Sequence, residues 1–136
     1  MTQYALDTNI VTYYLKGDKT AIDRIADETN NGHVIIIPPT VFYETKRWLL
    51  TIKGIKKLVL FEAMCSLSGI GFIDRKILEE ASVIFSDLQQ RGITIGDNDI
   101  LIAAYCIHFN LTLVTNNEKH FKHIAKLRTV NWLPWP

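Results

Sequence analysis

A continuous β-branched run, HVIII at residues 33–37, constrains the fold of this chain more than any other feature. A strand with water on one face alternates apolar and polar residues, so an unbroken apolar run is typical of a strand buried on both faces of a parallel sheet. Amphipathic helical patterns flank the run on both sides. Strands that alternate with helices favour an α/β domain with helices on both faces of the sheet.

The same alternation is predicted along the whole chain. Strands are expected at residues 3–8, 33–37, 69–74 and 111–117, with a last short strand at 128–133. Helices are expected at residues 9–18, 20–32, 41–54, 55–67, 75–92 and 97–110, with Thr40 as the cap of the third helix. The prediction is a three-layer α/β/α domain with a mainly parallel sheet of four to five strands.

Composition is compatible with one folded domain and excludes a disulfide scaffold. The chain has 136 residues, of which 48% are hydrophobic and 21% charged, so it can bury a core. A formal net charge of +1 excludes no class of partner, because charge can be segregated. Cys65 and Cys106 lack metal-site spacing and are expected to be buried free thiols. Without a signal peptide or a membrane-spanning apolar stretch, the protein is expected to be cytoplasmic.

Polar residues stand where the first and fourth predicted strands end. Asp7 ends the first strand, and the polar run Thr115, Asn116 and Asn117 ends the fourth. Ligands of parallel sheets bind at the carboxyl ends of strands, near the point where the strand order reverses. These residues are therefore expected to face a binding site at one edge of the sheet.

Further acids are predicted to reach the same edge. Glu44 lies in the first turns of the helix after the second strand, and Asp97 and Asp99 begin the helix before the fourth. Clustered carboxylates repel one another, and a bound divalent cation relieves that repulsion. Carboxylate oxygens suit Mg²⁺ or Mn²⁺ better than Zn²⁺. Metals of this kind position phosphates, activate water and stabilise leaving oxygens.

Each acid also has an ordinary structural explanation. Asp7 alone fits a helix cap, and Glu44 alone fits a solvated residue or a pair with Lys46 or Arg47. The two acids that begin the late helix fit its first turn, where the helix dipole favours negative charge. The metal-site interpretation rests on the convergence of the acids at one edge of the sheet.

Four motifs, in order along the chain, resemble those of the PIN-domain nucleases. They are LDTN at 6–9, YET at 43–45, GDNDILIAA at 96–104, and LVTNN at 113–117 followed by Phe121. Together they span nearly the whole chain and are most similar to the VapC toxins of bacterial toxin–antitoxin pairs. The tail is similar to the VapC branch that cuts initiator tRNA in the anticodon loop, through Phe121, Leu127, Asn131 and Trp132.

The resemblance implies a single PIN domain, residues 1–136, with Mg²⁺- or Mn²⁺-dependent endoribonuclease activity. The implied catalytic and metal-binding residues are Asp7, Glu44, Asp99 and, as a further metal ligand, Asn117. Asp99 is preferred to Asp97 because it has the family's spacing to the following Ile-Ala-Ala. The residues in supporting roles are Asn9, which would orient Asp7, and Thr115, Asn116 and His120. The implied chemistry is in-line attack of metal-activated water on the phosphodiester, with the 3′ oxygen leaving.

One position departs from the family pattern. Many members have an acid directly before the Phe that follows TNN, whereas this chain has His120 there and Glu118 two residues earlier. A fourth carboxylate is therefore missing or displaced. Since Mn²⁺ accepts nitrogen ligands more readily than Mg²⁺, an inward His120 predicts weaker Mg²⁺ binding. The departure also keeps open a non-catalytic RNA- or antitoxin-binding domain with a degraded metal site.

Basic and aromatic residues flank the proposed acids. The candidates for contact with RNA phosphates are Lys46, Arg47, Lys119 and Lys122, each of which a solvated helix face also explains. Trp48, Trp132 and Trp135 are candidates for stacking on unpaired bases, although core or dimer packing is favoured for Trp132.

Two other protein classes share parts of the pattern. A phosphoacceptor receiver domain would need an acidic pair near the first strand and a Lys after a late strand, and a haloacid-dehalogenase-like phosphatase would need a second acid where this chain has Asn9. Neither fits as well. The resemblance implies an RNA substrate, with tRNA favoured, and a VapB-like antitoxin that inserts a segment into the acidic groove. It also implies a homodimer, and no membrane partner.

Overall fold

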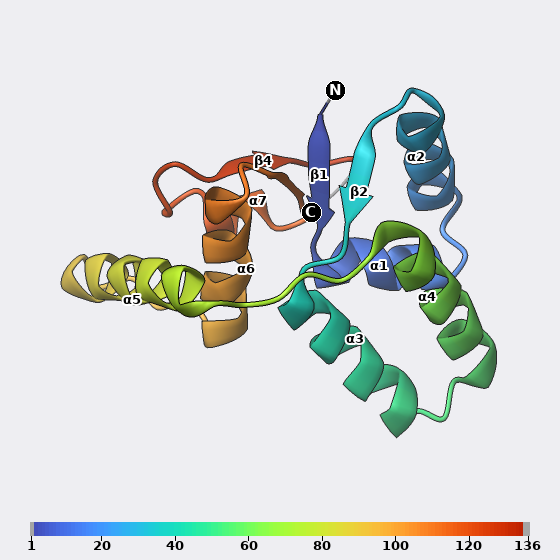
Figure 1. The fold of residues 1–136 in the computed structure, drawn as a ribbon, viewed down its shortest axis with the longest axis horizontal. Helices are drawn as coiled ribbons and strands as arrows, with labels where there is room; N and C mark the ends of the chain where they lie inside the picture. Colours follow the sequence, from blue (N-terminus) through green and yellow to red (C-terminus); the bar gives the residue numbers. More distant parts are fainter. Residues whose placement is uncertain (1, 135–136) are drawn as a thin grey trace.

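The computed structural model describes residues 2–134, which alternate strands and helices around one sheet (Figure 1). In chain order the elements are β1 (Gln3–Leu6), α1 (Thr8–Leu15), α2 (Lys19–Asn30), β2 (Val34–Ile36), α3 (Pro39–Thr51), α4 (Ile55–Ser68), α5 (Arg75–Gln90), α6 (Asp97–His108), β3 (Thr112–Val114), α7 (Glu118–Phe121) and β4 (Arg128–Val130). Trp135, a predicted stacking residue, lies outside the described residues.

The four strands are all parallel and follow the order β2–β1–β3–β4. Tyr4 of β1 stands opposite Ile35 of β2 on one side and Thr112 of β3 on the other. After β1 the chain adds β2 on one side of it, and later adds β3 and then β4 on the other side. Helices cover both faces, which confirms the predicted three-layer α/β fold. The strand order reverses beside the carboxyl ends of β1 and β3, where such folds bind ligands.

The core is centred on the two middle strands and on α6. Ala5 and Leu6 of β1 and Leu113 and Val114 of β3 are fully buried, and α6 packs an almost entirely buried middle segment against α3, α5 and β3. The high apolar content of α6 is thus explained by burial within the protein. None of the helices within residues 2–134 has the length and apolar character needed to cross a bilayer.

Three local predictions are wrong, and two of them concern the edge of the sheet. Residues 69–74 make only an isolated bridge from Ile70 to Ile37, because the chain turns at Gly69 (φ 74°) and then runs against Tyr105. That single bridge leaves β2 as an edge strand, so its residues Val34–Ile36 are only half-buried. Thr40 does not cap α3: Pro38 holds the cap position, and the buried Thr40 hydroxyl has no partner within the described residues.

The two cysteines are buried free thiols, as predicted. Cys65 packs on α4 and Cys106 on α6. Burial raises the pKa of the Cys65 thiol to about 11, and burial also raises the pKa of Cys106. Both thiols are therefore held in their unreactive protonated form at neutral pH.

Candidate active site

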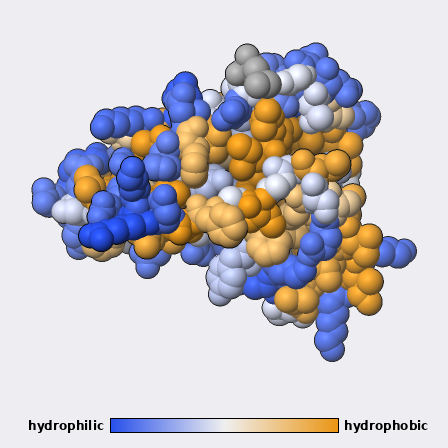
Figure 2. All heavy atoms as spheres, viewed as in Figure 1, coloured by the Kyte–Doolittle hydropathy of each residue, from blue (hydrophilic) through white to orange (hydrophobic). Residues whose placement is uncertain are grey.

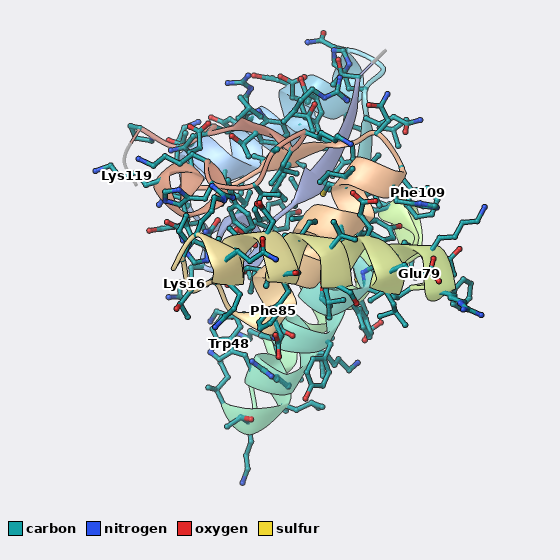
Figure 3. All side chains as sticks on the ribbon, turned by 90° about the vertical axis from the view of Figure 1, so that its left-hand side faces the viewer. Lys16, Trp48, Glu79, Phe85, Phe109 and Lys119 are labelled. Carbon is teal, nitrogen blue, oxygen red and sulfur yellow. The ribbon has the colours of Figure 1, made fainter. Side chains whose placement is uncertain are left out.

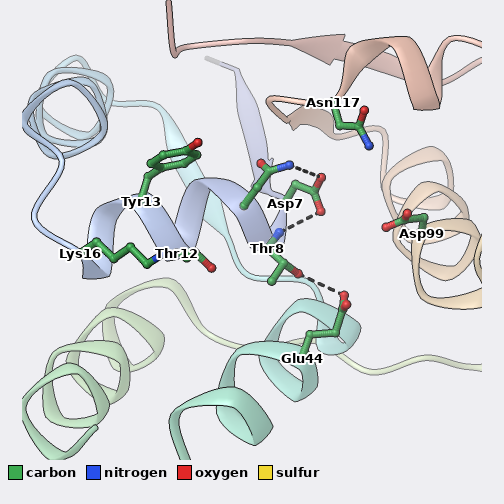
Figure 4. Close-up of a pocket in the computed structure, with 9 residues that line it drawn as sticks. Asp7, Thr8, Thr12, Tyr13, Lys16, Glu44, Asp99 and Asn117 are labelled. Carbon is green, nitrogen blue, oxygen red and sulfur yellow. Dashed lines mark hydrogen bonds between the residues drawn. The ribbon is translucent and has the colours of Figure 1, made fainter. Parts of the chain in front are cut away.

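Asp7 is a nearly buried carboxylate at the carboxyl end of β1, with 5% of its surface exposed. It is the N-cap of α1, and its Oδ1 accepts a 2.8 Å hydrogen bond from the Thr8 N–H. Its Oδ2 accepts bonds of 2.7 Å from the Thr115 hydroxyl and 3.3 Å from Asn9 Nδ2. Three donors from two segments therefore hold this carboxylate in one orientation, and Figure 4 shows the two that come from α1, Thr8 and Asn9.

Burial raises the pKa of Asp7 to about 6, because the charged form loses its water. The bonds from Thr115 and Thr8 lower the pKa, while the negative charges of Asp99 and Glu44 raise it. Asp7 is therefore electrostatically coupled to two carboxylates from other elements, and a cation placed among them would favour its charged form.

Glu44 and Asp99 approach Asp7 from two different helices. Glu44 lies on α3, and its Oε1 accepts a 3.1 Å hydrogen bond from the Thr8 hydroxyl. Asp99 lies in the first turn of α6, and its Oδ2 is 2.9 Å from His120 Nε2. That contact lacks the alignment of a hydrogen bond, and the ring nitrogen has no other partner within residues 2–134. His120 thus touches a candidate metal ligand without lining the cleft itself.

The three carboxylates line one cleft of about 490 Å³. Its wall comprises Asp7, Thr8, Asn9, Thr12, Tyr13, Lys16, Glu44, Asp99 and Asn117 (Figure 4). Asp97, two residues before Asp99, faces a different, apolar cleft beside Leu78 and Phe85. The structure therefore brings together the four residues assigned to metal binding and separates them from Asp97.

Sequence reasoning missed the residues that α1 contributes to this cleft. Thr8, Thr12 and Lys16 are spaced by four, which places them along one face of α1, between its N-cap Asp7 and its C-cap position at Lys16. This spacing was visible in the sequence. Its meaning depended on which face of α1 looks onto the cleft, and only the packing of α1 against α3 decides that.

A series of hydrogen bonds fixes the conformation of the loop that follows β3. The Thr115 hydroxyl accepts from the Asn117 N–H at 3.0 Å, and Asn9 Oδ1 accepts from the Asn116 N–H at 3.2 Å. Asn131 Nδ2 in turn donates to Asn116 Oδ1 at 3.1 Å. The tail after β4 is thereby linked to the residues that hold Asp7.

The other residues named from the sequence lie away from the cleft wall. Lys46 pairs with Glu62 of α4, and Arg47 lies over the Tyr43 ring, 4.0 Å from Glu44. Glu118 accepts a hydrogen bond from Thr129, and the nearby Lys119 and Lys122 are exposed.

The tryptophans differ in accessibility. Trp132 is buried and packs edge-on against Tyr4, which confirms the core packing that was one of the two alternatives, so it has no free face for a base. Trp48 is half-buried on α3, one turn after Glu44, with the ammonium group of Lys16 over its ring.

The donor set of the cleft suits a hard divalent cation. Its potential ligands are carboxylate, hydroxyl and amide oxygens, with no thiolate or imidazole on the wall. Within residues 2–134, no three acidic, imidazole or thiol side chains form a ready-made metal cage. Mg²⁺ commonly binds through one or two carboxylates and keeps several waters, so separated carboxylates still fit it.

Comparison with known proteins agrees with the motifs. The PIN-domain family model matches residues 4–127. Ribonuclease VapC2 of Rickettsia felis is 33% identical over 135 residues, covering 95% of this chain and 97% of that protein. The tRNA(fMet)-specific endonuclease VapC of Shigella flexneri is 27% identical over 135 residues, covering 97% and 99%.

Solved structures share the whole fold. The chain superimposes with a TM-score of 0.88 on VapBC2 from Rickettsia felis, solved bound to a DNA fragment from its promoter, at 30% identity, covering 97% of this chain and 100% of that one. VapBC from Salmonella typhimurium, solved bound to DNA, gives a TM-score of 0.85 at 22% identity, covering 98% and 100%. The second likeness shows the fold alone.

Proposed function

Because this chain belongs to the VapC group of the PIN-domain family, we propose that it is a metal-dependent endoribonuclease, the toxin of a type II toxin–antitoxin pair. One observation carries the proposal: Asp7, Glu44 and Asp99, from three separate elements, line a single cleft at the point where the strand order reverses. The electrostatic coupling of Asp7 to both other acids supports the same conclusion.

The residues of the cleft have distinct proposed tasks. Asp7, Glu44, Asp99 and Asn117 would hold Mg²⁺ or Mn²⁺, which supplies an activated water and stabilises the departing oxygen when bound. The Thr115 and Thr8 donors favour the charged form of Asp7 and orient its carboxylate. The Thr8 hydroxyl turns Glu44 toward the same space.

Single-stranded RNA is the proposed substrate, and tRNA is favoured. The cleft is open to solvent and is lined by residues of α1 and α3, which suits an unpaired strand whose bases can splay out. The likeness to a tRNA(fMet)-specific endonuclease supports cleavage in an anticodon loop.

A VapB-like antitoxin is the proposed protein partner. The C-terminal end of α3 and the first turns of α4 expose apolar side chains, including Leu50, Ile52, Ile55 and Val59. Figure 2 shows this apolar surface at its lower right, over α4. An antitoxin that covers it can place a segment in the acidic cleft, because α3 borders both. The related VapBC complexes support this pairing.

A homodimer and a cytoplasmic location complete the proposal. A second apolar cleft lies between α5 and α6, beside the exposed Leu78 and Phe85. We assign this surface to the second copy, because a surface of this kind is rarely left open on a monomer. Sedimentation of the purified protein tests this, and a monomer at micromolar concentration would contradict it.

The alternative is a domain that binds RNA or antitoxin without cleaving RNA. The contact of His120 with Asp99 favours it, since an imidazole occupies one side of a candidate ligand. Metal-dependent cleavage separates the two functions.

The decisive test is cleavage of total bacterial RNA with the 5′ and 3′ ends sequenced. Wild type with Mg²⁺ or Mn²⁺ should cut, and Asp99→Asn should not. Asp97→Asn makes the same change two residues away, outside the cleft, and should cut like wild type. Cuts at one site in tRNA would support the substrate, whereas scattered cuts in mRNA would contradict it. No metal-dependent cut at all would favour the binding-only domain.

A further inference from the structure

Lys16 stands at the far end of the cleft from the acids. Thr8, Thr12 and Lys16 follow one face of α1, and Lys16 caps its C-terminus. Lys16 lies eight positions after Thr8, or about 12 Å along the helix at 1.5 Å per residue. The cleft therefore has an acidic end at the start of α1 and a cationic end at its finish (Figure 4).

The surroundings of Lys16 leave its charge available. Its Nζ lies 5.9 Å from the centre of the Trp48 ring, on the neighbouring α3, and Figure 3 shows the two side chains next to each other. This cation–π contact positions the ammonium group and leaves its positive charge unneutralised. Lys16 forms no ion pair within residues 2–134, and it is the single Lys or Arg among the residues that line the cleft.

None of the basic residues named from the sequence has an unpaired charge on the wall of this cleft. Lys46 is paired with Glu62, and Arg47 is drawn toward Glu44. Lys119 and Lys122 are exposed on and after α7, off the cleft wall. Three carboxylates repel a polyanion that enters the cleft. A cation further along the same wall attracts it and so offsets part of that repulsion.

We propose that Lys16 binds a backbone phosphate of the single-stranded RNA whose scissile phosphate lies at the acidic end. Tyr13, on the same wall and 39% exposed, offers an aromatic face to an unpaired base beside that phosphate. This inference rests on the proposed ribonuclease function. It assigns Lys16 to substrate binding, whereas the acids serve the metal.

The salt dependence of RNA binding tests this role. A fluorescent single-stranded RNA oligonucleotide is titrated with full-length protein in EDTA, where no metal-dependent cleavage occurs, at several salt concentrations. Each phosphate contact to a single strand contributes about 0.7 to the slope of log affinity against log salt. Lys16→Gln should lower the slope by about that amount and weaken binding several-fold. Lys16→Arg should restore both.

Lys19→Gln is the matched control. It removes the same charge from an exposed lysine three residues away, one that is paired with Asp23 and lies off the cleft. Equal slopes for Lys16→Gln and Lys19→Gln would overturn the proposal, because general charge would then explain the loss. An unchanged slope for Lys16→Gln would also overturn it, because the loss of a phosphate contact must lower the slope.

Cleavage by wild type keeps this test separate from that of the function. If wild type cuts RNA with metal but Lys16→Gln keeps the wild-type slope, only the role of Lys16 fails. If wild type cuts nothing with any metal, the ribonuclease proposal fails. Thermal melts of each variant in EDTA confirm that the binding changes occur in folded protein.

Discussion

The Thr115 hydroxyl donates a 2.7 Å hydrogen bond to Asp7 Oδ2, and its oxygen accepts a 3.0 Å bond from the Asn117 N–H. Asp7 and Thr115 are 108 residues apart in sequence but follow the neighbouring strands β1 and β3. Thr115 is fully buried, so water cannot replace its bonds. One side chain thus both favours the charged form of Asp7 and fixes the loop that carries Asn117.

Thr115→Val should impair folding and metal-supported cleavage together. Valine keeps the shape but leaves Asp7 Oδ2 with one donor fewer and the Asn117 N–H unpaired, which should lower the free energy of unfolding by about 1–3 kcal/mol. Losing the bond also raises the pKa of Asp7 further. As the pH is lowered, Asp7 should therefore become protonated, and cleavage should be lost, at a higher pH than in wild type. Urea unfolding and pH profiles of cleavage measure both effects. Thr115→Ser keeps the hydroxyl and should retain the wild-type pH profile; a wild-type profile in Thr115→Val would contradict the assignment.

Asp7→Asn should abolish cleavage without weakening the metal-free fold. The substitution removes a buried charge that Glu44 and Asp99 disfavour, while an amide oxygen can still accept from Thr8. Asp7→Ala also loses the helix cap and should be less stable than Asp7→Asn by about 1 kcal/mol. Thermal melts in EDTA at pH 7 compare the three proteins. If Asp7→Asn melts well below wild type, Asp7 is a structural cap that the fold needs in charged form.

The raised pKa of Asp7 predicts how metal-free stability changes with pH. Its pKa rises from an ordinary 3.8 to about 6, so between these values the folded protein holds a proton that the unfolded chain has released. The stability contribution of this group is therefore present below pH 4 and falls as pH rises to about 6. The total loss is about 3 kcal/mol at 1.36 kcal/mol per pKa unit.

Denaturant unfolding of wild type and Asp7→Asn in EDTA, from pH 4 to pH 7.5, isolates that contribution. As the pH rises, the unfolding free energy of wild type should fall relative to that of Asp7→Asn. Parallel curves would mean that Asp7 titrates alike in the folded and unfolded states. Saturating Mg²⁺ should stabilise wild type more at pH 7.5 than at pH 5, because the cation prefers the charged carboxylate.

His120→Asp should strengthen Mg²⁺-supported cleavage. His120 Nε2 lies 2.9 Å from Asp99 Oδ2, so aspartate there would place a carboxylate beside the candidate metal ligand and supply the oxygen that Mg²⁺ prefers. Wild type should correspondingly work better with Mn²⁺ than with Mg²⁺. Metal titrations of cleavage compare wild type, His120→Asp and the uncharged His120→Gln. Superimposable Mg²⁺ curves for all three would show that His120 does not influence the metal site.

The sequence was informative wherever a residue's neighbours along the chain decide its environment. The short apolar runs predicted β1, β2, β3 and β4, and the helical periodicities predicted six of the helices, with ends displaced by a few residues. The motif order placed the chain in its family before any contact was known. The run at 69–74 misled because it contains Ile70, Phe72 and Ile73, yet the chain turns at Gly69 and reaches the edge of β2 only at Ile70.

Tertiary structure alone decided how the residues of the cleft meet. Sequence motifs could nominate Asp7 and Glu44, but only the packing of α1 against α3 turns Thr8 toward Glu44 and Lys16 along the same wall. It also directs Lys46 to Glu62 and away from the cleft. The physical reason is that local propensity acts over a few residues, whereas the charge and burial of this cleft depend on elements that are far apart in the chain and adjacent in space.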